Sequence, residues 1–356
     1  MAVRMVRRVV TMVLVVSIAV AVYVHRTDLR AALHNMGALS PGWVVMLLVV
    51  FALGMVAQGL VLQAVTPGLT LRQSWMVQES ATAATNTIIG SGPVSTGVRI
   101  AMLRRWQIAD RAVAISIVAQ NVIAAFAVWT VALLTALAGA SGATSNVVDH
   151  RVFVGVSIAA AAMLTGSLLF WWLLLSHPAP IGWMAQRLQR LLHRAHQRWP
   201  RVPALDLVTI AETGRTDARS LLRNRGRRIA LATIFDQTIT VAKPVIVIRA
   251  FGISGAVLPT TTILVAWGLV RLAAALSPLP GGVGVTEIGL ATLLTRFGGP
   301  EAAVLAAVLT YRVLTFVLPM FTGGACLAWW RWHNQSARII HPDLSFPDLV
   351  TATELR

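Results

Sequence analysis

The chain has 356 residues, of which 56% are hydrophobic and only 12% charged, and its mean hydropathy is +0.73. A soluble protein carries about twice that charged fraction, so the composition excludes a set of water-soluble domains. The net charge of +17 comes from arginines that gather in loops beside apolar segments. That distribution is typical of a membrane protein and gives no reason to expect nucleic acid as a partner.

Six apolar segments are predicted to cross the membrane, since a helix needs about 20 apolar residues to span a bilayer. Their apolar residues run on continuously rather than alternating, which favours α-helices over barrel strands. The segments are 9–24, 43–64, 112–138, 152–175, 229–249 and 302–330. The first could instead be a signal peptide, because arginines precede it and Ala19-Val20-Ala21 resembles a cleavage site. We interpret it as the first membrane helix.

Two further apolar segments, 76–98 and 258–298, are interrupted by glycine and proline. Residues of these types at such density end a helix, so each segment is predicted to form two half-helices that enter and leave by the same face. The expected breaks in these two re-entrant hairpins are at Pro93, Gly97, Pro280, Gly281, Gly282 and Gly284.

The charges of the loops predict the topology. Residues 176–228 carry eleven arginines and include a basic amphipathic stretch at 183–199, so they are expected to be cytoplasmic, whereas 140–151 is nearly uncharged and expected outside. With both termini in the cytoplasm, 76–98 must dip in from the cytoplasmic face and 258–298 from the outer face. Residues 1–356 then form a single integral membrane domain.

This topology describes an inverted repeat, with repeat 1 at about 43–138 and repeat 2 at about 229–330. Pro93-x3-Gly97-Val98 matches Pro280-x3-Gly284-Val285, and each is followed by a span with a polar pair, Gln120-Asn121 or Tyr311-Arg312. In transporters, inverted repeats with interrupted helices place the binding site near the midplane between the halves. The alternative is that proline–glycine breaks recur by chance in the two halves.

Polar residues inside the apolar segments need partners or a wet cavity, because a charged side chain at the bilayer centre costs at least about 2.5–3.5 kcal/mol. Asp236, Thr240 and Lys243 lie at i, i+4 and i+7 and share one helix face, so they are expected to line a cavity. For Lys243 the alternative is a side chain that snorkels to the surface.

Glu287 and Arg312 are expected to form an ion pair. Glu287 begins a half-helix, where a carboxylate is stabilised by the helix dipole, but Arg312 lies too deep in 302–330 for capping to explain it. Because a guanidinium binds phosphate through two hydrogen bonds, Arg312 and Arg99 are alternatively ligands for a lipid phosphate.

The second break and the polar pair after it resemble the signature of a known family. Ser277-Pro278-Leu279-Pro280-Gly281-Gly282-Val283-Gly284-Val285-Thr286-Glu287, followed by Tyr311-Arg312, is similar to the lysylphosphatidylglycerol synthase transmembrane-region family. These are flippase-like proteins related to the membrane half of the bacterial multiple peptide resistance factor. Ala83-Ala84-Thr85-Asn86 and Pro93-x3-Gly97-x-Arg99 extend the resemblance over about 10–330. Gln120-Asn121 stands where the family often has a Glu-Arg pair.

The resemblance implies a lipid flippase-like transporter of the bacterial inner membrane that moves an anionic or modified phospholipid, for example an aminoacylated one. The chain is not expected to be an enzyme, because no segment matches the synthase half, and no cofactor or metal is expected. Its partners would be membrane phospholipid and a separate lipid-modifying synthase. The alternative is an accessory protein that binds lipid without transporting it. The expected headgroup and cavity residues are Asn86, Arg99, Asp236, Lys243, Glu287 and Arg312.

Overall fold

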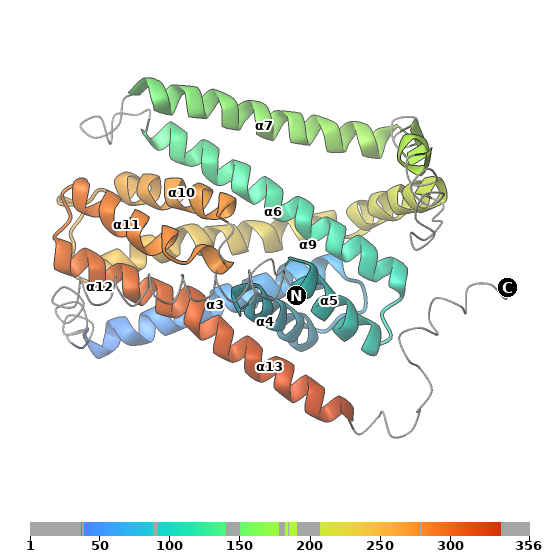
Figure 1. Cartoon of the computed structure of the whole chain (residues 1–356), viewed down its shortest axis with the longest axis horizontal. Coiled ribbons are helices and arrows are strands. Elements are labelled where there is room, and N and C mark those ends of the chain that lie inside the picture. The colour runs from blue at the N-terminus through green and yellow to red at the C-terminus, as the bar shows by residue number, and fades with distance from the viewer. Residues whose placement is uncertain are drawn as a thin grey trace, which may run out of the picture.

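The computed structural model describes residues 37, 39–87, 92–139, 150–177, 182–183, 185–190, 207–277 and 280–335. In these ranges all regular secondary structure is helical, as predicted, and the helices form one elongated bundle (Figure 1).

Five of the described helices are long and apolar enough to cross a membrane. They overlap five of the six predicted crossings, and the sixth, 9–24, lies outside the described residues. The five are α3 (Pro41–Val65), α6 (Asp110–Ala138), α7 (His150–Ser176), α9 (Leu207–Ala250), and one continuous run made of α12 (Glu301–Arg312), the π-helix η3 (Val313–Val317) and α13 (Leu318–Gln335). The chain is therefore a multi-pass helical membrane protein.

Helix α9 is longer than the sequence suggested. Its 44 residues extend over about 66 Å at 1.5 Å per residue, about twice the thickness of a hydrocarbon core. The arginine-rich residues 207–228 were expected in a cytoplasmic loop, but they form the first half of this helix. Residues 207–228 contain no proline, and the glycines at 214 and 226 only weaken a helix rather than end it.

The first broken segment forms two helices that pack against each other, α4 (Leu71–Thr87) and α5 (Gly92–Arg105). At the start of α4, the Thr70 hydroxyl accepts a hydrogen bond of 3.3 Å from the backbone N–H of Gln73, and the Gln73 side-chain oxygen accepts one of 3.0 Å from the backbone N–H of Thr70. These two bonds fix where the helix begins. Pro93 lies in the first turn of α5, where its missing N–H is not needed. Gly97, expected at the break, lies inside α5 instead, because one glycine only weakens a helix.

The second broken segment forms α10 (Thr260–Leu276), the short 3-10 turn η2 (Pro280–Gly282) and α11 (Val285–Arg296). Gly281, Gly282 and Gly284 have φ values of 61°, 62° and 82°, in the left-handed region where a side chain is disfavoured. A Cβ on Gly281 would also clash with the ring of Phe316. The glycines are therefore required for this turn.

The two hairpins, α4–α5 and α10–α11, meet at their broken ends. Figure 1 shows the α10–α11 hairpin to the left and the α4–α5 hairpin towards the centre right, each with its break facing the middle of the bundle. Helix α4 contacts η2, and the amide oxygen of Asn86 lies near the backbone of Gly281. Helix α4 packs on α13, while α10 packs on α6, so each hairpin contacts the long helix that follows the other hairpin.

The buried apolar residues form two separate clusters. One surrounds α10, α11 and α12 and includes Leu47 and Phe51 of α3, and the other surrounds α4 and α5 and includes Leu62 and Val65 of the same helix. Helices α3 and α9 each enter one cluster near one end and the other cluster further along. The stretch between these two parts is 55–61 in α3 and 236–243 in α9. The middle of the bundle is therefore free to hold polar groups.

Candidate polar cavity

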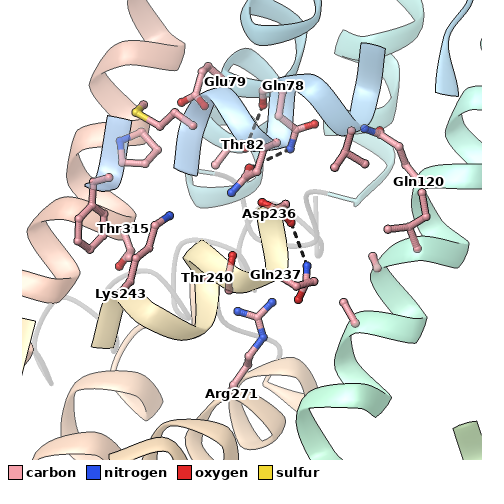
Figure 2. Close-up of a pocket in the computed structure, with 18 of the residues that line it drawn as sticks. Gln78, Glu79, Thr82, Gln120, Asp236, Gln237, Thr240, Lys243, Arg271 and Thr315 are labelled. Atoms are coloured by element: carbon pink, nitrogen blue, oxygen red, sulfur yellow. Dashed lines mark hydrogen bonds between the residues drawn. The ribbon is translucent and has the colours of Figure 1, made fainter. Parts of the chain in front are cut away.

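A cavity of about 460 Å³ occupies this middle region. Helices α3, α4, α5, α6, α9, α10 and the α12–α13 run all contribute side chains to it (Figure 2). The polar and charged lining residues are Gln58, Gln78, Glu79, Thr82, Arg99, Gln120, Asn121, Asp236, Gln237, Thr240, Lys243, Arg271, Tyr311 and Thr315.

The cavity contains three cations and two carboxylates. The cations are Arg99, Lys243 and Arg271, and the carboxylates are Glu79 and Asp236. Among the described residues, none of the five makes an ion pair within 4 Å of another charged group. Charged groups that face a common space without pairing leave their hydrogen-bonding capacity for a ligand or for water.

The α9 side of the cavity agrees with the sequence analysis. Asp236, Thr240 and Lys243 all line the cavity, and Figure 2 shows them along one face of the helix. Lys243 is only 8% exposed, and its amine lies 5.0 Å from the ring centroid of Phe51, so the snorkelling alternative is wrong. Asp236 accepts a hydrogen bond of 2.9 Å from the side chain of Gln237.

Arg99 is held on the opposite side by glutamine side chains. Its guanidinium donates to the side-chain oxygens of Gln120 on α6 and Gln78 on α4, the latter at 3.2 Å. Gln78 in turn donates to Gln58 on α3 at 3.2 Å. This network orients the guanidinium, while its Nε is buried and has no hydrogen-bond partner in the described part of the chain.

Glu287 and Arg312 form the predicted ion pair, outside the cavity lining. Arg312 Nε donates to Glu287 Oε1 at 2.7 Å, and the other carboxylate oxygen accepts the backbone N–H of Gly284 at 2.7 Å. Asn86 also lies outside the lining, where its amide donates to the backbone oxygen of Phe316 at 3.4 Å. Glu287 and Arg312 therefore join the second hairpin to α12, and Asn86 joins α4 to η3, whereas Arg99, Asp236 and Lys243 belong to the cavity.

Two charged cavity residues were missed by the sequence analysis. Glu79 is 2% exposed and accepts a hydrogen bond of 3.2 Å from Thr322 of α13, and Arg271 enters the cavity from α10. Each stands inside a broken apolar segment, where the cost of burying a charge would have identified it.

Among the described residues, no three His, Cys, Asp and Glu side chains come together in a group that could hold a metal ion.

The family model described as "Lysylphosphatidylglycerol synthase TM region" matches residues 9–323, which is most of the chain and includes every residue that lines the cavity. No curated protein matches the sequence.

Proposed function

Because the chain belongs to the lysylphosphatidylglycerol synthase transmembrane-region family, we propose that it moves an anionic or modified phospholipid between the leaflets of the membrane. The observation that carries this proposal is the charged cavity in the middle of a bundle of membrane helices, to which both hairpins contribute side chains. On this proposal the chain itself does not modify the lipid, and any aminoacylating synthase is a separate protein.

The packing of the hairpins supports an inverted repeat around this cavity. The first helices of the two halves, α3 and α9, pack on each other, and the hairpins pack reciprocally, α4 on α13 and α10 on α6. Two repeats related by an axis in the membrane plane would produce this pattern, with re-entrant hairpins that dip from opposite faces and a binding site at the midplane.

The energetics of lipid crossing explain what such a cavity would do. A headgroup that crosses the bilayer loses water around its charges, and this loss is the main barrier to unassisted crossing. Arginine donors and amide groups in the cavity would replace that water. A cavity of about 460 Å³ has the size of a small-molecule site, so it would hold the headgroup while the acyl chains stay in the bilayer.

We propose further that the chain lies in the bacterial inner membrane, as its family suggests, and that both termini are cytoplasmic, which the arginine distribution favours. In this orientation the arginine-rich first half of α9 faces the cytoplasm, where anionic lipid headgroups attract it.

The proposal is tested with the purified full chain in vesicles that contain phosphatidylglycerol with a fluorophore on one acyl chain. Dithionite added outside bleaches only the outer leaflet. If the protein moves the lipid, bleaching continues to near completion, whereas in protein-free vesicles it stops at about half. Bleaching that stops at half with protein present would contradict transport, and lipid that still co-purifies with the protein would then indicate an accessory role.

A further inference from the structure

The charges around the cavity are not balanced. Three cations and two carboxylates leave one positive charge. Both carboxylates interact electrostatically with Lys243, and Asp236 interacts with Arg271 as well. A headgroup with one negative charge would neutralise the cavity. A zwitterionic headgroup would leave the excess in place, and a headgroup with a net positive charge would add to it and be repelled.

An amine on the headgroup would find one carboxylate oxygen without a partner among the described residues, Oδ1 of Asp236. Glu79 is 2% exposed and accepts a hydrogen bond from Thr322, and Asp236 accepts one from Gln237. Both carboxylates interact with Lys243, and Asp236 also interacts with Arg271, so an ammonium group could bind there only in competition with these cations. It would also add a positive charge to a cavity that already holds one in excess, which is electrostatically costly.

Phosphate, in contrast, would find donors that have no partner. The Nε atoms of Arg99 and Arg271 are buried and make no hydrogen bond to the described residues. In Figure 2 the guanidinium of Arg271 points away from α10 toward Thr240 and Asp236, into the cavity. A guanidinium forms strong charge-assisted hydrogen bonds to phosphate oxygens.

The remaining lining is rich in carboxamides. Gln58, Gln78, Gln120, Asn121 and Gln237 line the cavity together with threonine hydroxyls. A carboxamide both donates and accepts hydrogen bonds, as a hydroxyl group does, so the two are complementary in any orientation. Five neutral amides in one membrane cavity are more than an orienting network for Arg99 requires, since Asn121 and Gln237 take no part in it.

We infer that the cavity takes a phosphodiester headgroup that bears several hydroxyl groups and no amine, such as a phosphopolyol or a phosphosugar. The arginines bind the phosphate, the amides bind the hydroxyls, and the excess positive charge excludes aminoacylated headgroups. This inference rests on the proposed function for its site but specifies a narrower substrate.

Headgroup preference is measured with four fluorescent phospholipids in the dithionite assay, carrying glycerol, inositol, ethanolamine or lysyl-glycerol headgroups. We expect the glycerol and inositol lipids to cross at least about tenfold faster than the other two. Sites that hydrogen-bond a substrate hydroxyl group can reject an analogue without it by much larger factors than this. Equal or faster crossing of the lysyl-glycerol lipid would overturn the inference and leave the proposed function intact.

A binding measurement separates the inference from transport. Short-chain lipids with the same four headgroups are added to the protein in detergent, and the thermal unfolding midpoint is recorded. The two hydroxylated lipids should raise the midpoint at lower concentration than the two amine lipids. If no lipid crosses vesicles but this order holds, the proposed function fails and the headgroup inference stands; the reverse order overturns the inference.

Two variants connect the preference to the cavity. Asn121→Leu removes an amide with little change in volume. It should lower the ratio of the crossing rate of the inositol lipid to that of the ethanolamine lipid at least about fivefold, as expected where a hydroxyl-binding group is lost. Arg271→Gln removes the excess charge and should lower the glycerol-to-ethanolamine ratio. Ala125→Leu, on the same helix as Asn121 but outside the lining, is the matched control. Unchanged ratios in both cavity variants would refute the assignment.

Discussion

The Glu287–Arg312 ion pair should stabilise the α10–α11 hairpin against α12, and its energy can be isolated by a double-mutant cycle. The two side chains are 27% and 12% exposed, so water screens them little. In Arg312→Gln, the carboxylate of Glu287 still accepts its hydrogen bond from the backbone N–H of Gly284. In Glu287→Gln, the guanidinium keeps its contact with the Phe316 ring, 4.8 Å from the ring centroid, and its Nη2 is already buried with no hydrogen-bond partner among the residues that the structure describes.

Breaking a buried pair by removing one partner costs about 3–5 kcal/mol, because the other charge is left uncompensated. We therefore expect Glu287→Gln to lie near the upper end of that range and Arg312→Gln near the lower end. The double variant should lose less than the sum of the two losses, by about 1–3 kcal/mol, as for directly contacting residues.

Unfolding in detergent, followed by tryptophan fluorescence against denaturant, measures all three losses. Arg296→Gln and Glu301→Gln are matched controls, since both remove exposed charges from the same two helices, and each should change stability by less than about 0.5 kcal/mol. Strict additivity of Glu287→Gln and Arg312→Gln would refute a direct stabilising contact.

Two further predictions concern topology and the second break. In a cysteine-free background, Ser254→Cys should react with an impermeant thiol reagent from outside intact cells, and Ser220→Cys only after permeabilisation; labelling of both from the same side would contradict opposed hairpins. Gly281→Ala should greatly reduce the folded yield, because its Cβ would clash with a phenylalanine ring at a left-handed φ of 61°. Gly284→Ala has open space around its Cβ and should cost only about 1–2 kcal/mol of backbone strain, and equal yields of the two variants would show that the clash is relieved elsewhere.

The helices and the ion pair could be predicted because each follows from a large free-energy cost that is visible in the local sequence. Continuous apolar runs identified the long helices, and the cost of a lone deep arginine identified Glu287 as the partner of Arg312. The shared face of Asp236 and Lys243 followed from helical spacing alone, and both residues line the cavity.

What the sequence did not predict depends on tertiary packing. Nothing in the local pattern shows that Glu79 lies against Thr322 or that Arg271 reaches the α9 side of the cavity, since those partners are far away in the chain. The extent of α9 was missed because charge density was interpreted as a loop, although arginine is a good helix former. Gly97 was placed at a break because a glycine can end a helix but does not have to.

The central claim, that lipid headgroups pass through the cavity, is tested most directly by two neighbouring tryptophan variants. Ala124 lines the cavity, whereas Ala125 is exposed on the same helix outside the lining. In the dithionite assay with phosphatidylglycerol, Ala124→Trp should strongly reduce lipid crossing by obstructing the cavity, and the Ala125→Trp protein should move the lipid as fast as the wild type. Undiminished crossing by a folded Ala124→Trp protein would contradict the claim.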